Sequence, residues 1–427
     1  MRKVCAVVAG LMLSGATLAR AQVTAIKAGK LLDTEASVVL ADQVILIRDG
    51  KIAAVGRGLA IPDDAQVIDL SRMTVLPGLI DCHTHLTDAA TEVDPLDELK
   101  TTAAEKAFGS IPNARRTLEA GFTTVRDVGA YRAFVDLALR DAIARGDVVG
   151  PRVFAAGAYV TSSGGAGALT GFAPDITLPW DLKFGQANSP WEVRERIREL
   201  ANRGVDLIKV LATGAVLTHG SKPAAEEFTP EELEAAVGEA RKFGLRVAAH
   251  AHGAEGIKNA LRAGVASIEH GTFLDAEGIA LMKEHGTYLV ADLYDGDYIQ
   301  AEGKRLGMPK EFLEKNAQTA EIQRQNFGKA AAAGVKMAFG TDAAVYPHGW
   351  NARQFPYLVE YGLTTMEAIQ SATAGAADLL GKSGELGSLK PGKRADVIAV
   401  EGDPTQDVSV LEHVQFVMKD GKVYKQE

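Results

Sequence analysis

The stretch Val75-Leu-Pro-Gly-Leu-Ile-Asp-Cys-His-Thr-His-Leu86 decides the fold that we expect for this chain. Its apolar start predicts a buried strand, and the strand ends in two histidines that one residue separates. Because residues two apart face the same side of a strand, His83 and His85 can both reach one metal ion. Such a pair also occurs as two hydrogen-bonded core histidines. The other segments of the chain are therefore needed to distinguish a metal site from a structural pair.

Seven further short apolar segments follow, and helical patterns separate most of them. Thr229 as N-cap and Gly244 as a stop predict one such helix over residues 230–243. Strands that alternate with helices predict an α/β protein with a parallel sheet. Their number and the chain length suit a closed (β/α)8 TIM barrel, with an open doubly wound sheet as the alternative. The segments are residues 75–86, 123–129, 152–160, 206–214, 246–253, 267–272, 288–293 and 336–342.

Both ends of the chain are rich in β-strand patterns. Residues 44–47 and 52–55 flank Asp49-Gly50, a turn pair that predicts a hairpin. A strand over residues 396–400 and a second hairpin around Asp420-Gly421 follow near the other end. We therefore expect a small β-sandwich domain built from residues 22–77 and 389–427, with the barrel formed by residues 78–388.

The first 21 residues have the pattern of an export signal. Arg2 and Lys3 precede an apolar stretch that is short for a membrane span, and Ala19-Arg20-Ala21 offers a cleavage site. We expect a signal peptide over residues 1–21 and an exported protein, periplasmic or secreted. An uncleaved anchor is the alternative, but no later apolar span follows, so we expect no stable membrane insertion after signal removal.

The composition points to a small-molecule partner. The chain has 427 residues and a formal net charge of -9, and no basic run marks a nucleic-acid surface. Of its two cysteines only Cys82 lies beyond the predicted signal, so export does not imply a disulfide.

Polar side chains stand at or near the ends of five predicted strands. Because the carboxyl ends of barrel strands meet at one rim, we predict that these side chains share a pocket. His270 alone could be a core histidine bonded to backbone, and Asp342 alone could be a helix N-cap. Taken together they favour a metal-dependent hydrolase. The residues are His83 and His85, Lys209, His250 and His252, His270, and Asp342.

Lys209 is unusual because it lies inside an apolar strand, where an unpaired ammonium is costly to bury. One interpretation is a salt bridge to a neighbouring acid. The other is that burial lowers the pKa of the amine, which then reacts with carbon dioxide to form a carbamate. A carbamate is an anionic ligand with two oxygens and can bridge two divalent ions.

These motifs together resemble the metal-dependent amidohydrolase superfamily over nearly the whole mature chain. The resemblance rests on Gly78-Leu-Ile-Asp-Cys-His-Thr-His85, the central lysine, the two later histidines, Gly340-Thr-Asp342 and the closing residues 387–396. More narrowly, residues 208–210, 249–253 and 268–271 are similar to the imidazolonepropionase-related branch. That branch includes Xaa-Pro and Xaa-Arg dipeptidases and ochratoxinase-type amidohydrolases.

The resemblance implies a set of roles for the site. The first metal would be held by His83, His85 and Asp342. The second would be held by His250 and His270, with carboxylated Lys209 as the bridge and zinc as the usual metal. His252 would bind the free carboxylate of the substrate. Several relatives carry a histidine in the glycine-rich loop where this chain has Ala166, so a carbonyl or carboxylate contact from that position is not expected here. Relatives commonly form large homo-oligomers, which implies a homo-oligomer here, with an octamer as one form.

The resulting functional expectation is an amide hydrolase that releases a C-terminal amino acid from dipeptides or N-acyl amino acids, ochratoxin A included. In this hypothesis Asp342 also moves protons, and Val216, Leu217 and Tyr294 are candidates for pocket walls. The alternative is a cyclic-amide or imidazolone ring hydrolase or a deaminase of the same superfamily. Single-metal members of those classes need no lysine bridge, so a metal count separates the two. A non-catalytic binding module would lack ligands, and all six are present.

Overall fold

The computed structural model of the chain describes residues 23–91, 97–173 and 175–427. The predicted signal peptide, residues 1–21, lies outside the described residues. None of the helices in these ranges has the length and apolar character that crossing a membrane requires.

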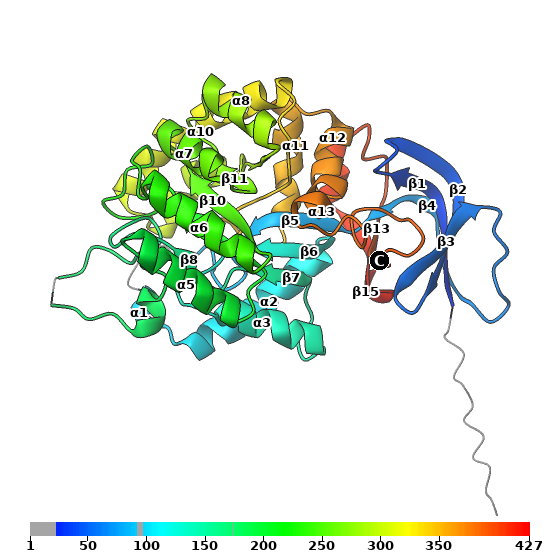
Figure 1. Cartoon of the computed structure of the whole chain (residues 1–427). Coiled ribbons are helices and arrows are strands. Elements are labelled where there is room, and N and C mark those ends of the chain that lie inside the picture. The colour runs from blue at the N-terminus through cyan, green and yellow to red at the C-terminus, as the bar shows by residue number, and fades with distance from the viewer. Residues whose placement is uncertain (1–22, 92–96, 174) are drawn as a thin grey trace, which may run out of the picture.

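Strands from both ends of the chain form one sheet. β4 pairs in parallel with β1 and antiparallel with β13, so N-terminal and C-terminal strands lie side by side at one end of the molecule (Figure 1). We expected a small β-sandwich from both termini, and in the structure its strands are joined in one hydrogen-bonded sheet because β4 is long enough to pair with both partners. The strands, in the order β15-β14-β13-β4-β1-β2-β3, are Lys422–Gln426, Val414–Lys419, Val397–Val400, Gln66–Pro77, Thr24–Asp33, Val38–Arg48 and Lys51–Arg57.

The middle of the chain contains two parallel sheets. One has the order β5-β6-β7, with β5 over Leu79–Thr84, β6 over Phe122–Asp127 and β7 over Arg152–Ala155. The other has the order β12-β11-β10-β9-β8, and its strands are Tyr288–Val290, Ser267–His270, Arg246–Ala251, Leu207–Leu211 and Tyr159–Val160. This arrangement confirms an α/β protein with parallel strands.

Two of the eight predicted strands differ from a regular barrel strand. The third segment is split into β7, which pairs with β6, and β8, which pairs with β9. The eighth segment contains no continuous strand. It joins its neighbours through the single bridges Leu289↔Met337 and Thr84↔Ala343. The structure therefore shows two parallel sheets, with the split segment at one junction and the bridged segment at the other, in place of one closed sheet.

Helices cover the parallel sheets (Figure 1). α6 begins as predicted, with a capping box between Thr229 and Glu232, and it ends at Lys242 before Gly244. Apolar side chains of strands and helices, such as Phe122, Ile208 and Leu233, form the largest core cluster. The helices are α1 Asp97–Lys100, α2 Ala103–Glu119, α3 Val135–Arg145, α4 Trp180–Lys183, α5 Pro190–Asn202, α6 Pro230–Lys242, α7 Ala254–Ala263, α8 Ala276–His285, α9 Asp295–Leu306, α10 Lys310–Ala332, α11 Gln354–Glu360, α12 Thr365–Ser371, α13 Ala374–Leu379, and the short 3-10 turns Asn351–Arg353 and Val408–Glu412.

Candidate active site

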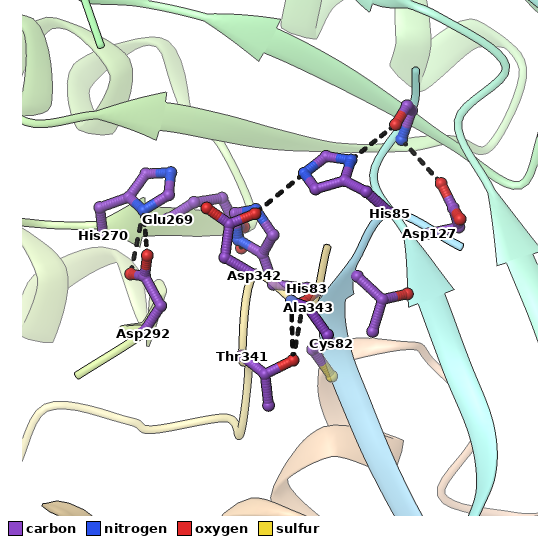
Figure 2. Close-up of polar contacts among 12 residues, drawn as sticks. Cys82, His83, His85, Asp127, Glu269, His270, Asp292, Thr341, Asp342 and Ala343 are labelled. Atoms are coloured by element: carbon purple, nitrogen blue, oxygen red, sulfur yellow. Dashed lines mark hydrogen bonds and ion pairs between the residues drawn. The ribbon is translucent and has the colours of Figure 1, made fainter. Parts of the chain in front are cut away.

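A first cluster of possible metal ligands joins β5 to the end of the eighth segment. His85 Nε2 lies 3.1 Å from Asp342 Oδ1, and His83 Nε2 lies 3.4 Å from the same oxygen. Figure 2 shows the contact between the Asp342 carboxylate and the His85 ring as a dashed line. The backbone N–H of Asp342 donates to His83 O at 2.9 Å, which fixes the two segments against each other. The three side chains can place one ligand atom each around a single ion.

A second cluster consists of His250, His252 and His270, which come from the ends of β10 and β11. The ring centroids of His250 and His270 are 4.5 Å apart. The His270 ring is also 4.9 Å from the His83 ring, so the two clusters are neighbours. Histidines and the carboxylate that we predicted from distant segments therefore meet in one place.

His270 and Asp342 share a further property, a left-handed backbone. Their φ angles are +68° and +53°. Non-glycine residues rarely adopt this region, and such strain costs about 1–3 kcal/mol and gathers at functional sites. The fold thus holds two of the predicted ligands in a backbone region that few non-glycine residues occupy.

Hydrogen bonds outside the clusters fix which nitrogen of each imidazole faces inward. Three histidines donate Nδ1–H to an oxygen acceptor, so that Nε2 is the nitrogen left for an ion. His250 is reversed, because its Nε2 donates to Gly214 O at 3.1 Å and Nδ1 stays free. The three pairs are His83 with Glu269 at 3.0 Å, His85 with Gly129 O at 2.7 Å, and His270 with Asp292 at 2.8 Å.

Burial keeps most of these imidazoles neutral. It lowers the pKa of His83 and His250 well below the usual value, and it lowers the pKa of His270 to about 4. For His85 burial acts in the same direction, but the hydrogen bond to the Asp342 carboxylate outweighs it and raises the pKa to about 9. Neutral imidazoles beside a carboxylate are the donor set that a divalent transition metal prefers.

Lys209 lies in β9 with 2% of its surface exposed, and it lines the same pocket. Burial lowers the pKa of its amine to about 8. Among the described residues no carboxylate lies within ion-pair distance of its Nζ, so the salt-bridge interpretation has no partner. Glu269 and Asp342 act on the amine only at longer range.

The clusters open into a pocket with a cavity volume of about 240 Å³. His252, Val216 and Leu217 line this pocket, as does Ala166. Tyr294 does not, which corrects our prediction for that residue. Its ring packs against Tyr346 with centroids 4.8 Å apart, and its hydroxyl accepts a hydrogen bond from Arg353 at 3.1 Å.

Comparison with known proteins identifies the family. The model of the amidohydrolase family matches residues 74–425. The chain is a member of the amidohydrolase family. This amidohydrolase is similar to the ochratoxinase of Aspergillus niger, with 34% identity over 426 aligned residues that cover 95% of this chain and 87% of the relative. It is also similar to the imidazolonepropionase of Maricaulis maris, with 28% identity over 383 residues, 82% of this chain and 85% of the relative.

A solved structure resembles this amidohydrolase still more strongly. A Xaa-Pro dipeptidase with methionine bound in its active site matches it with a TM-score of 0.89 and 41% identity, covering 95% of this chain and 100% of the other. These relatives confirm the branch that the motifs indicated. The protein is therefore a hydrolase that acts on amide bonds.

Several polar residues of the amidohydrolase site were missed by reasoning from the sequence. Tyr159 Oη lies 3.1 Å from His85 Nδ1, and Asp292 and Glu269 hold two of the imidazoles. Burial, together with the nearby Asp342 charge, raises the pKa of Asp292 to about 8. Tyr159 and Asp292 stand at the ends of predicted strands, so the rule that selected the histidines could have selected them. Glu269 carries no such signal, since strand alternation points it away from its neighbour His270.

Proposed function

We propose that this amidohydrolase is a binuclear metal enzyme on a (β/α)8 barrel with a small β domain from both termini. It would release a C-terminal amino acid from dipeptides or N-acyl amino acids, with ochratoxin A as one candidate substrate. The observation that carries the proposal is the pair of adjacent ligand clusters beside a buried lysine in one pocket. The likeness to an ochratoxinase and to a Xaa-Pro dipeptidase supports the substrate class.

The residues present fit a pair of divalent ions. His83, His85 and Asp342 would hold the first ion through the nitrogens and the carboxylate oxygen that face one another, and the ion would replace the proton between His85 Nε2 and Asp342. His250 and His270 would hold the second. Both ions would share carboxylated Lys209, whose neutral amine attacks carbon dioxide with loss of one proton. Zinc suits this mixture of imidazole and carboxylate donors.

In the proposed reaction Asp342 carries a proton from the attacking water to the leaving amide nitrogen. Bound divalent ions would supply positive charge that polarises the scissile carbonyl and acidifies a water molecule. The oxygen of that water forms a bond to the carbonyl carbon while Asp342 accepts its proton. Asp342 then gives the proton to the amide nitrogen, and the C–N bond breaks. The place of Asp342 in the pocket lining, with its carboxylate 3.1 Å from His85 Nε2, supports this role.

A second candidate function is hydrolysis of a cyclic amide or imidazolone ring, or deamination. The likeness to an imidazolonepropionase favours it. A single-metal mechanism of that kind does not need a lysine bridge. Metal analysis therefore separates the candidates: about two ions per chain supports the binuclear amidase, and one ion supports the alternative.

We further propose that His252 binds the substrate carboxylate. Its ring is buried in the pocket, and Thr272 Oγ1 lies 2.7 Å from Nδ1. When the Thr272 hydroxyl donates to Nδ1, Nε2–H is left to donate to an anionic oxygen.

For His252→Ala we predict that kcat/KM for free-carboxylate substrates falls about 10- to 150-fold, the value of one hydrogen bond to a charged group. The measurement compares N-acyl amino acids, dipeptides and ochratoxin A with their C-terminally amidated forms. His413→Ala, an exposed residue near β14, is the control and should leave both rates unchanged. Equal cleavage of free and amidated substrates by the unmodified enzyme would refute carboxylate binding by His252.

We also propose that the chain is exported, to the periplasm or the medium, and that it forms homo-oligomers. The N-terminal signal pattern supports export, and the homo-oligomer is proposed from the family resemblance alone. Mass analysis of the mature N-terminus and light scattering of the purified protein test them directly.

A further inference from the structure

One side of the pocket is formed by an unusually long connection. Between Leu211, where β9 ends, and Pro230, where α6 begins, the chain forms neither helix nor strand. Long irregular connections in a compact domain are usually functional. Residues 215–221 form the tip of this connection, which we call the pocket loop. Val216 and Leu217 of the pocket loop line the cavity.

Lys315 of α10 holds the pocket loop from outside. Its side chain is nearly buried, and its Nζ donates to Thr218 O at 2.6 Å and to Ala215 O and Ser221 O at 3.3 Å each. An ammonium has three donors, and three carbonyls of one loop lie within hydrogen-bond distance of this one, the Thr218 carbonyl being the nearest. Hydrogen bonds from a charged donor are about twice as strong as neutral ones. Such a set fixes the loop backbone at three points.

Glu311, one turn earlier on α10, completes the attachment. Its carboxylate accepts from the Gly220 N–H at 3.0 Å and lies 3.3 Å from His219 Nδ1. It also forms an ion pair with Lys315 at 3.2 Å. We call Lys315 and Glu311 together the clasp. The clasp thus bonds both to carbonyls and to an N–H group of the pocket loop.

The helix that carries the clasp also contributes Phe312 to the cavity wall. Phe312 lies between the two clasp residues in the sequence and lines the cavity, together with Met308 and Ile299. The Lys315 Nζ is 5.1 Å from the centroid of the Phe312 ring. Because α10 holds the loop and contributes Phe312, the spacing between the pocket loop and this ring depends on the clasp.

We propose that the clasp determines substrate specificity. It positions the pocket loop so that Val216 and Leu217 face Phe312, Met308 and Ile299 across a subsite for a large apolar group of the substrate. Lys315 and Glu311 are positioning residues, since neither is placed at the reacting atoms. This inference rests on the proposed amidase function and narrows its substrate class to amides with a bulky apolar substituent.

The test compares Lys315→Met with Lys310→Met. Both lysines stand on α10 in an i,i+4 ion pair with a glutamate, but Lys310 pairs with Glu314 in solvent, with 88% of its side chain exposed. The substrates are N-acyl amino acids and dipeptides that differ only by a benzyl or a methyl group. For Lys315→Met the ratio of kcat/KM values, benzyl over methyl, should fall about tenfold, mainly through KM, as expected when an apolar pocket loses its fit. Lys310→Met should keep the ratio.

A second variant covers the case in which Lys315→Met does not fold. The Glu311 side chain is 40% exposed, and Glu311→Ala removes its bond to Gly220 while Lys315 keeps its three carbonyl acceptors. Glu314→Ala is the matched control on the same helix. Glu311→Ala should lower the same ratio in the same direction. Metal content should stay at the unmodified level in all four variants, because none of these side chains lies in the ligand clusters.

Amide hydrogen exchange separates this inference from the proposed function. Exchange over residues 215–221 should become faster in Lys315→Met and in Glu311→Ala but not in the two controls. Unchanged exchange would overturn the clasp whatever the activity. Faster exchange with an unchanged benzyl-to-methyl ratio, or an unmodified enzyme without preference for benzyl, would overturn the specificity role. An unmodified enzyme that cleaves none of these amides would instead refute the proposed function.

Discussion

Replacing Asp342 by asparagine should lower kcat by about 10²- to 10⁴-fold, the usual contribution of one general acid–base group. The carboxylate lies 3.1 Å from His85 Nε2 and is largely buried. Burial by itself would raise its pKa, but the imidazoles of His83 and His85 outweigh this effect and hold the pKa well below the usual value. Asp342 is therefore ionised at neutral pH and can accept a proton. Asparagine keeps the shape and an oxygen ligand but cannot take up the proton.

The measurement pairs steady-state kinetics with elemental analysis of the same preparation. Metal content should remain close to that of the unmodified enzyme, so that the loss lies in turnover. Asp378→Asn is the matched control, because Asp378 bonds to Tyr288 Oη outside the pocket and should not affect kcat. A D342N enzyme that retains more than a tenth of the original kcat would show that another group moves the proton.

The positions of the site residues could be predicted because one geometric rule acts on all of them. In a parallel α/β fold the carboxyl ends of the strands gather, so His83 and His250 had to lie near each other although the chain separates them widely. The rule predicts the position of a residue at the end of a strand, but it does not predict the orientation of its side chain. Tyr294 follows β12, as the rule requires, yet its ring packs onto Tyr346 and leaves the pocket.

The break in the third strand could not be read from the pattern of apolar residues. Gly157 separates β7 from β8 and has a φ of +80°. A Cβ atom at this position would lie 2.8 Å from Val205, so glycine is required there for space as well as for conformation. Hydrophobic pattern indicates that a segment is buried, but it carries no information on which neighbour each half pairs with. The same limit applies to the terminal strands, which pair in one sheet through β4.

Replacing Lys209 by alanine should remove most of the bound metal and lower activity by about a thousandfold or more. Loss of several kcal/mol of charge stabilisation by the ions corresponds to about three powers of ten in rate. The fold should survive, since the lysine is 2% exposed and its ammonium has no carboxylate within ion-pair distance among the described residues. Removing an unpaired buried charge relieves a cost of burial.

Short carboxylic acids such as formate, acetate and propionate should restore part of the metal and part of the activity in K209A. The substitution leaves space next to His250 and His270 in which a small carboxylate can replace both oxygens of the carbamate. Lys419→Ala is the matched control, because Lys419 is also buried but donates to Gly150 O at 2.6 Å in the terminal sheet. The Lys419→Ala variant should keep its metal, and the acids should not change its metal content or its activity.

The pH dependence of the unmodified enzyme tests the same idea independently. Burial lowers the pKa of Lys209 to about 8, and only the neutral amine, which predominates above that pH, attacks carbon dioxide. Reloading of metal-free protein with zinc and bicarbonate should therefore become faster as the pH rises from about 6 to 8, with the steepest change near the pKa. K209A loaded in the presence of acetate should lack this rise, because it has no amine to deprotonate. Metal binding by K209A at the unmodified level without any acid would show that Lys209 is not a bridging ligand.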